Sequence, residues 1–171
     1  MKIPIPALKA AARESQYIRE LEAFRNAIVI NQFFTSAPLF RELGEETAHE
    51  LMTRSTLRYQ APGDIIVRQG DIGRSFYMIV RGEVRIVIDG HEIKRLRQGA
   101  FFGEISLIAD IPRTASVYAT APTMVLELAA SNFWEILCQN IELALFVEAV
   151  AEARIQEDLL VATIREKHQA S

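Results

Sequence analysis

A glycine, a glutamate and an arginine in the segment 102–119 have the chemistry of an anion site. Gly103 permits a tight turn before a short apolar run, and the first N–H groups of a helix starting there have no intrahelical acceptor. Arg113 can add two parallel hydrogen bonds to phosphate oxygens. Glu104 would repel bare phosphate unless the ligand also carries hydroxyls that donate to it. These residue types predict a ligand that joins a phosphate to hydroxyls, such as a ribose phosphate.

Glu104 and Arg113 stand nine positions apart, and a structural ion pair between them is the alternative. The intervening residues are typical of a short helix followed by a turn at Pro112, a connection that can bring both side chains to one pocket. A buried ion pair adds little net stability, because desolvation of both charges offsets their attraction. The ligand pocket is therefore the preferred interpretation.

The composition indicates one globular domain with a helical appendage. The chain has 171 residues, 50% of them hydrophobic, and a formal net charge of -3. Such a charge provides no broad basic field, so we expect no nucleic-acid partner. No apolar run reaches the roughly 18–20 residues that span a bilayer, which predicts no membrane insertion by this chain. A single cysteine, Cys138, favours a reducing, cytoplasmic location.

The first third of the chain is helical in character. Residues 8–31 lack glycine and proline and place apolar residues at three- and four-residue spacing, at Ile18, Leu21, Phe24 and Ile28. That apolar face needs a partner. A second helix is predicted over 45–56, after the break at 37–44.

Strands and tight turns dominate the middle of the chain. Seven of the eight glycines fall between positions 63 and 103, separated by β-branched runs. Asp89-Gly90 is a strong hairpin signal, because both residues tolerate positive φ. Strands are predicted at 65–67, 76–80, 84–88, 92–96, 115–119 and 124–128. The pattern predicts an α+β fold, an antiparallel, jelly-roll-like β-roll of about eight strands over 55–130, flanked by N-terminal helices and two C-terminal helices.

The last part of the chain is predicted to be two helices over about 131–168, with Ser131 as N-cap and a bend near Asn140. The longer helix carries apolar residues at roughly heptad spacing. They are Phe146, Val150, Ala153, Leu160 and Ile164. This stripe would cover the β core; a seam between two copies of the helix, and hence a homo-oligomer, is the alternative.

Two short segments resemble the phosphate-binding cassette of cyclic-nucleotide-binding domains, the family shared by protein kinase A regulatory subunits, the catabolite activator protein and cyclic-nucleotide-gated channels. They are Phe102-Gly103-Glu104-Ile105-Ser106-Leu107 and Pro112-Arg113-Thr114-Ala115-Ser116-Val117. The upstream turns 62–64, 70–73 and 81–84 are also similar, so the resemblance extends over about 38–154.

The resemblance implies a role for each matching position. Glu104 would accept from the ribose 2′-hydroxyl, and Arg113 would pair with the exocyclic phosphate oxygens. Backbone N–H groups would come from Gly103, Ile105 and Ser106.

Three further roles follow from the resemblance. Thr114 matches a position whose hydroxyl contacts the guanine amino group or a phosphate oxygen in some members. Arg154 falls where channel-type members cap the base, with a solvated helix charge as the alternative. Apolar strand residues would border the base. They are Val84, Ile86 and Ile93.

The resemblance also implies a regulatory sensor rather than an enzyme, with no cofactor or metal. We expect cyclic AMP as the ligand, with cyclic GMP as the alternative, and C-terminal helices that move over the site. Residues 1–36 would be a helical linker and 37–171 the binding domain. The lead-in at 37–40 is similar to the segment that joins a channel pore to its nucleotide domain. The chain is thus expected to be a cytoplasmic part of a prokaryotic channel, or a stand-alone bacterial sensor.

Two other functions compete with the sensor. A domain that has lost its ligand and serves protein contacts would keep the fold, but this sequence retains both Glu104 and Arg113. A cupin-like metalloenzyme would need clustered histidines, whereas His49, His91 and His168 are scattered.

Overall fold

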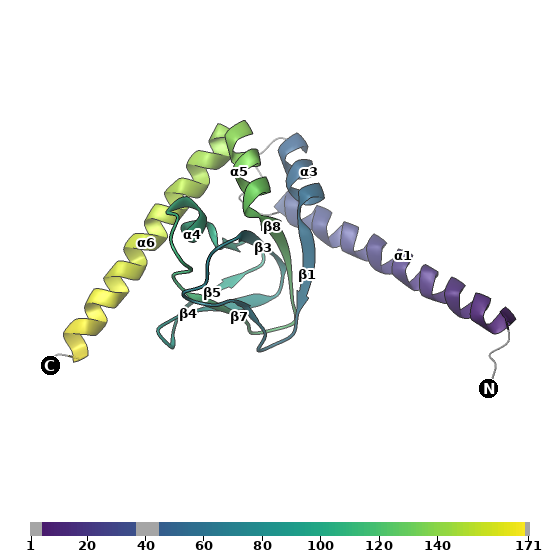
Figure 1. Cartoon of the computed structure of the whole chain (residues 1–171), viewed down its shortest axis with the longest axis horizontal. Helices are drawn as coiled ribbons and strands as arrows, with labels where there is room; N and C mark the ends of the chain where they lie inside the picture. Colours follow the sequence, from purple (N-terminus) through teal and green to yellow (C-terminus); the bar gives the residue numbers. More distant parts are fainter. Residues whose placement is uncertain (1–4, 37–44, 170–171) are drawn as a thin grey trace.

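The protein folds as a β-roll with helices gathered at one end and two long helices that leave it (Figure 1). The structure is a computed structural model; it describes the backbone of residues 5–36 and 45–169, and side chains within 13–33, 46–160 and at 163. The predicted break at 37–44, including the channel-like lead-in at 37–40, lies outside the described residues.

Eight strands form two four-stranded antiparallel sheets, with strand orders β1-β8-β3-β6 and β2-β7-β4-β5. The strands are β1 (Thr56–Gln60), β2 (Ile65–Val67), β3 (Ser75–Arg81), β4 (Glu83–Ile88), β5 (His91–Arg97), β6 (Phe101–Phe102), β7 (Ser116–Ala119) and β8 (Thr123–Ala129). The predicted α+β fold with an antiparallel roll is confirmed. Strands β1 and β6 were not among the predicted ranges, and β1 begins at Thr56, which the sequence placed in a helix.

The helices are α1 (Ile5–Ser36), α3 (Glu45–Arg54), α4 (Glu104–Ile108), α5 (Ala130–Gln139) and α6 (Ile141–Gln169). Figure 1 shows α3, α5 and the start of α6 together at one end of the roll, while α1 and α6 point away on opposite sides. In the described part of the chain, no helix combines the length and apolarity needed to cross a membrane.

Local sequence chemistry explains two junctions. Asp89 and Gly90 adopt φ values of 50° and 80°, the left-handed pair that a two-residue hairpin between β4 and β5 requires. Asn140 separates α5 from α6 and caps α6, because its Oδ1 accepts from the Leu143 N–H at 3.0 Å. The predicted bend is confirmed, but Ser131 is not an N-cap: α5 begins at Ala130, and its N-cap is Ala129.

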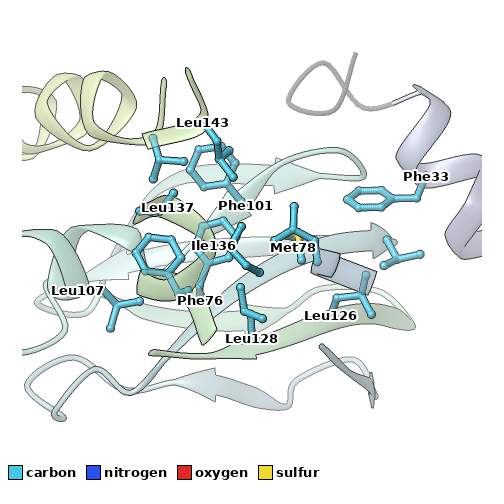
Figure 2. Packing of buried hydrophobic residues seen from close by; sticks show 14 residues of the cluster. Phe33, Phe76, Met78, Phe101, Leu107, Leu126, Leu128, Ile136, Leu137 and Leu143 are labelled. Atoms are coloured by element: carbon cyan, nitrogen blue, oxygen red, sulfur yellow. The ribbon is translucent and has the colours of Figure 1, made fainter. Parts of the chain in front are cut away.

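The larger of two apolar clusters lies between the β1-β8-β3-β6 sheet and the helices. Figure 2 shows Phe76 and Leu128 of the sheet packed with Ile136 of α5 and Leu143 of α6, and Phe33 of α1 at the edge of the cluster. Burying an apolar side chain of this size stabilises the fold by about 1.5–3 kcal/mol. The second cluster fills the inside of the roll, between the two sheets.

The face of α6 that covers the roll differs from the predicted stripe. Leu143, Val147 and Ala151 are at most 4% exposed, whereas Phe146 and Leu160 are 44% and 61% exposed. The buried line of side chains through Val147 is offset by one residue from the predicted line through Phe146. One residue corresponds to a rotation of about 100° around the helix. Val150 packs against the core and Phe146 contacts Phe101 at a ring-centroid distance of 6.2 Å, so only part of the predicted stripe covers the sheet.

The apolar face predicted for α1 remains open to solvent in this chain. Ile18, Leu21 and Ile28 are each 50% exposed and Phe24 is 67% exposed. Phe33, near the end of the helix, is 1% exposed and belongs to the main core cluster. The helix is therefore anchored at its C-terminal end only, as far as the described side chains show.

Candidate ligand-binding site

A cavity of about 60 Å³ lies at the mouth of the β-roll, between β4, β5, α4 and α6. Its wall is apolar on the strands except for Lys94 of β5, and it carries charged residues on the two helices and the loop before β7. All seven residues predicted for the site line this cavity. They are Gly103, Glu104, Ile105, Ser106, Arg113, Thr114 and Arg154.

Arg113 follows the Pro112 turn and is 7% exposed. Its Nη1 donates to the Gly103 carbonyl and to Ser106 Oγ, each at 2.7 Å, and its Nη2 donates to the Ser75 carbonyl. Burial lowers the pKa of the Arg113 guanidinium, although an arginine remains protonated at neutral pH. The side chain is thus a fixed positive charge whose donors are shared between the start of α4 and the start of β3.

The backbone of Arg113 is equally well held. Its N–H donates to the Asp71 carbonyl and its own carbonyl accepts from the Gly70 N–H, each at 2.8 Å. These two bonds join the cassette to the loop between β2 and β3, so this loop and the cassette are positioned as one unit.

Gly103 is required by geometry at the turn into α4. Its φ is 91°, in the left-handed region, and a Cβ there would lie 2.7 Å from Arg113 Nη1. The residues of the first turn of the five-residue α4, whose N–H groups lack intrahelical acceptors, line the same cavity as Arg113.

Glu104, the first residue of α4, is 1% exposed. Its Oε1 accepts from Arg154 Nη1 at 2.6 Å, whereas its Oε2 is buried without a hydrogen-bond partner among the described residues. A buried carboxylate oxygen left unpaired is costly to the fold, so it is expected to serve a donor from outside the protein. No ion pair joins Glu104 to Arg113 in the described part of the chain, and the structural pair considered from the sequence is therefore wrong.

Arg154 connects α6 to the cavity. Besides Glu104, its Nη1 donates to the Phe101 carbonyl at 2.9 Å, and its guanidinium carbon lies 4.9 Å from the centroid of the Phe101 ring. Its side chain is 17% exposed, so the alternative of a solvated helix charge is wrong. A second link between α6 and the roll joins Glu157 to Lys94 Nζ at 2.8 Å.

Two charged residues on the cavity wall were not predicted. Asp158 lies one helical turn after Arg154, and burial raises the pKa of its carboxyl, with nearby Lys94 opposing that shift. The i, i+4 spacing from Arg154 is the sequence signal that could have found it. The second is Lys94 of β5, whose Nζ pairs with Glu157 of α6.

Of the three apolar residues expected to border the base, one lines the cavity and two do not. Ile86 lines the cavity, whereas Val84 is fully buried in the core of the roll and Ile93 is not part of the wall. Among the described residues, no group of three or more His, Cys, Asp or Glu side chains could hold a metal ion, so the cupin-like alternative has no support there.

Comparison with known proteins agrees with this geometry. Residues 57–140 match the family model described as cyclic nucleotide-binding domain. The chain belongs to this family. The cyclic nucleotide-binding domain contains the whole cassette and both sheets, while Arg154 and Asp158 on α6 lie beyond the matched residues.

Curated relatives of this cyclic nucleotide-binding domain include a kinase regulatory subunit and ion channels. The chain is 31% identical over 121 residues to a cAMP-dependent protein kinase regulatory subunit of Eremothecium gossypii, covering 70% of this chain and 26% of that protein. It is 33% identical over 128 residues to the potassium/sodium hyperpolarization-activated cyclic nucleotide-gated channel 4 of Homo sapiens, covering 72% of this chain and 11% of the channel. The chain thus spans about a quarter or less of these curated relatives.

A solved structure shares the architecture. The catabolite activator protein of Thermus thermophilus aligns with a TM-score of 0.65 and 27% identity, covering 76% of this chain and 63% of that one. The chain is a cyclic nucleotide-binding regulatory domain built on the fold of these proteins.

Proposed function

We propose that the chain is a sensor that binds a cyclic nucleotide in the cavity lined by Glu104 and Arg113. The observation that carries the proposal is the buried Oε2 of Glu104, which has no partner among the described residues and belongs to the same cavity as a guanidinium. A ligand with a phosphate for Arg113 and a hydroxyl donor for Glu104 satisfies both groups at once. The ribose 2′-hydroxyl and the cyclic phosphate have these properties. The backbone N–H groups at 103–106 would add further donors.

The small cavity volume supports a coupling between ligand binding and movement of α6. At about 60 Å³ the cavity is far smaller than the roughly 300 Å³ at which small-molecule pockets begin. We therefore expect a bound nucleotide to displace α6, which would stretch or break the bonds from Arg154 to Glu104 and Phe101. The ligand favours whichever helix position it binds more tightly, and that preference sets the size of the response.

The ligand we expect is cyclic AMP, with cyclic GMP as the alternative. The printed name of the kinase relative contains cAMP and supports this order. Asp158 on the wall can accept hydrogen bonds from the amino group of either base, so it allows both nucleotides. Thr114 also lines the cavity and would contact a phosphate oxygen or a guanine amino group. Arg154 would cap the base once α6 has moved.

The surrounding protein is proposed from the same comparisons. Residues 1–36 would act as a linker that passes the movement on, and 37–171 as the binding domain. The channel relative supports a place at the cytoplasmic face of a membrane channel, and a stand-alone sensor is the second candidate. The exposed apolar stripes on α1 and α6 make self-association through helices a part of this proposal.

Calorimetric titration with cyclic AMP and cyclic GMP tests the function. Wild type should bind at least one of them at submillimolar concentration. Arg113→Ala should weaken binding by roughly 30-fold to several thousand-fold, because a partly buried charge-assisted partner contributes about 2–5 kcal/mol. Arg81→Ala, at an exposed arginine outside the cavity, is the matched control and should leave binding unchanged.

Absence of binding by the folded wild-type protein would favour the alternative of a domain that has lost its ligand. If Arg113→Ala and Arg81→Ala bind the nucleotide with equal affinity, the nucleotide does not bind in the cavity lined by Arg113. Circular dichroism and thermal unfolding of each variant separate a lost contact from a lost fold.

A further inference from the structure

A second, larger hollow lies on the other side of Arg113. Its volume is about 320 Å³, and its wall comes from β2, the loop between β2 and β3, the start of β3 and one residue of β8. Among the described residues, only Arg113 and Val67 line both this outer hollow and the inner cavity described above. A volume of this order is within the range of small-molecule sites.

The outer hollow has an excess of unpaired positive charge. The side chains of Arg68 and Arg74 lie on its wall, and the described residues offer neither of them an ion pair or a hydrogen bond. Arg113 is the third guanidinium. The opposing carboxylates are Asp71 and Glu127. Glu127 is already engaged, because it accepts from Arg58 at 2.9 Å, from Ser75 Oγ at 3.0 Å and from the Tyr77 hydroxyl at 3.1 Å.

The loop that carries Arg68 and Arg74 is held in place before any ligand arrives. The Gln69 N–H donates to Ser116 Oγ, and the Gln69 side chain exchanges two hydrogen bonds with Asp89, all at 2.9 Å. The bonds between Gly70, Asp71 and the Arg113 backbone complete the support. A site whose loop is already positioned loses less entropy when a ligand binds.

An exposed apolar side chain stands beside these charges. Ile72 is 75% exposed on the wall of the hollow, and the partly buried Ile65 and Ile66 line it as well. The hollow thus offers guanidiniums to an anion and an apolar surface to whatever the anion is attached to.

We propose that the outer hollow is a second ligand site, for a small organic phosphate whose phosphate group lies among Arg68, Arg74 and Arg113 and whose apolar part contacts Ile72. This site goes beyond the cyclic nucleotide function and does not need it. Because Arg113 is common to both sites, two anions would share one guanidinium and repel each other. Occupation of the outer hollow therefore weakens binding in the inner cavity, and the effect is reciprocal.

Inorganic phosphate and phenyl phosphate are the probes, titrated at constant ionic strength and followed by the amide resonances of residues 68–77. Phenyl phosphate should bind roughly tenfold more tightly than inorganic phosphate, because its ring removes apolar surface of Ile72 from water. Ile72→Ala should bring the two affinities close together.

Charge variants locate the site. Arg68→Gln combined with Arg74→Gln should weaken phenyl phosphate roughly three- to tenfold, whereas Asp71→Asn, which removes the opposing carboxylate, should strengthen it. Arg81→Gln is the control, an exposed arginine outside both cavities. Opposite shifts from two sets of variants cannot arise from loss of folding alone. If the double variant behaves like Arg81→Gln, or if Asp71→Asn has no effect, the proposal is wrong.

The coupling is measured separately, by titrating cyclic nucleotide with and without saturating phenyl phosphate. We expect roughly a three- to fivefold loss of nucleotide affinity, within the usual range of coupling between sites. This step rests on the proposed function. If the nucleotide does not bind, the proposed function fails while the phosphate titrations still decide the outer site. If both ligands bind independently, the shared role of Arg113 is wrong.

Discussion

The inner cavity and the outer hollow meet at Arg113, yet they are built differently. The inner cavity has a volume of about 60 Å³, and an ion pair joins two residues of its wall. The outer hollow has a volume of about 320 Å³, and two arginines on its wall have no side-chain partner among the described residues. In the inner cavity the unsatisfied group is a buried acceptor, Glu104 Oε2, whereas in the outer hollow it is a pair of exposed donors. A buried unpaired group is costly and selects its ligand strongly; exposed charges are screened and select weakly. This difference predicts that the inner cavity binds its ligand with high specificity and that the outer hollow binds with modest affinity.

The largest expected effect is a loss of cyclic nucleotide affinity in Glu104→Ala, a substitution that alters the inner cavity and leaves the outer hollow intact. Both cyclic nucleotides should lose roughly 10- to 150-fold in affinity, since a hydrogen bond to a charged group contributes about 1.5–3 kcal/mol and the ribose is common to both. The free energy of unfolding should fall by about 1–3 kcal/mol at most, because the lost bond from Arg154 to Oε1 is partly offset by removal of the unpaired Oε2. Titration calorimetry and urea unfolding measure the two quantities.

Glu142→Ala, at an exposed acidic residue in the first turn of α6, is the control for Glu104. The affinity of the outer hollow for phenyl phosphate should be the same in wild type, Glu104→Ala and Glu142→Ala. A loss of phosphate binding in Glu104→Ala alone would mean that the two sites are one.

A second comparison uses two glycines with similar backbones. Gly103 and Gly63 have φ values of 91° and 93°, but a Cβ would meet Arg113 Nη1 only at Gly103. Gly63→Ala should therefore destabilise the fold by about 1 kcal/mol through backbone strain, and Gly103→Ala by about 2 kcal/mol or more. Denaturant unfolding measures both. Gly103→Ala should also impair both sites by displacing Arg113. Equal losses of stability would show that the guanidinium moves aside freely.

A smaller effect concerns the choice of base in the inner cavity. Guanine presents an amino group and a ring N–H on the same edge, whereas adenine presents one amino group, so a carboxylate favours guanine. Asp158→Asn should shift the ratio of the cyclic GMP and cyclic AMP affinities toward cyclic AMP by roughly three- to tenfold. The neighbouring Glu157→Gln, which disrupts only the exposed pair with Lys94, should leave the ratio unchanged. An unchanged ratio in Asp158→Asn would place the base away from α6.

The smallest expected effect is on the free energy of unfolding at acidic pH, and it sets the pH range in which the folded protein can be used to compare the two sites. Hydrogen bonds from Arg97, Thr120 and Arg95 lower the pKa of Glu83 to about 2, from 4.5. A lowered carboxyl pKa stabilises the folded state above the unfolded value, and this contribution is lost as the pH falls from about 4.5 toward about 2. Glu83→Gln should flatten the stability profile in that window only. Urea unfolding at several pH values tests it; an unaltered profile would assign acid sensitivity to other carboxyls.

The elements that could be predicted from sequence depend on local chemistry. Asp89-Gly90 specifies its hairpin because the turn needs two residues that tolerate positive φ. The link between Gly103, Glu104 and Arg113 is also short, so a helix and a turn suffice to bring them to one cavity.

The contacts that were missed depend on how α6 meets the roll. Arg154 reaches Glu104 across 50 positions, and Asp158 reaches the cavity by the same approach. Apolar residues occur on two adjacent lines of α6, so periodicity does not decide which line is buried. The contact of Asn140 Nδ2 with Thr47 Oγ1 at 2.9 Å helps to fix the start of α6 against α3, a tertiary interaction that no local pattern reveals.

The long helix α6 can act as a lever, because its start is held at Asn140 and the bonds from Arg154 hold it part-way along its length. Gln169, at the end of the helix, lies 29 positions beyond Asn140, which is about 43 Å of helix. Once the bonds from Arg154 are released, a tilt of roughly 10° about Asn140 would move that end by about 8 Å, enough to make or break packing with a neighbouring element. A chemical event the size of one hydrogen bond would thus become a displacement of several ångströms, produced by the stiffness of a helix rather than by a change of fold.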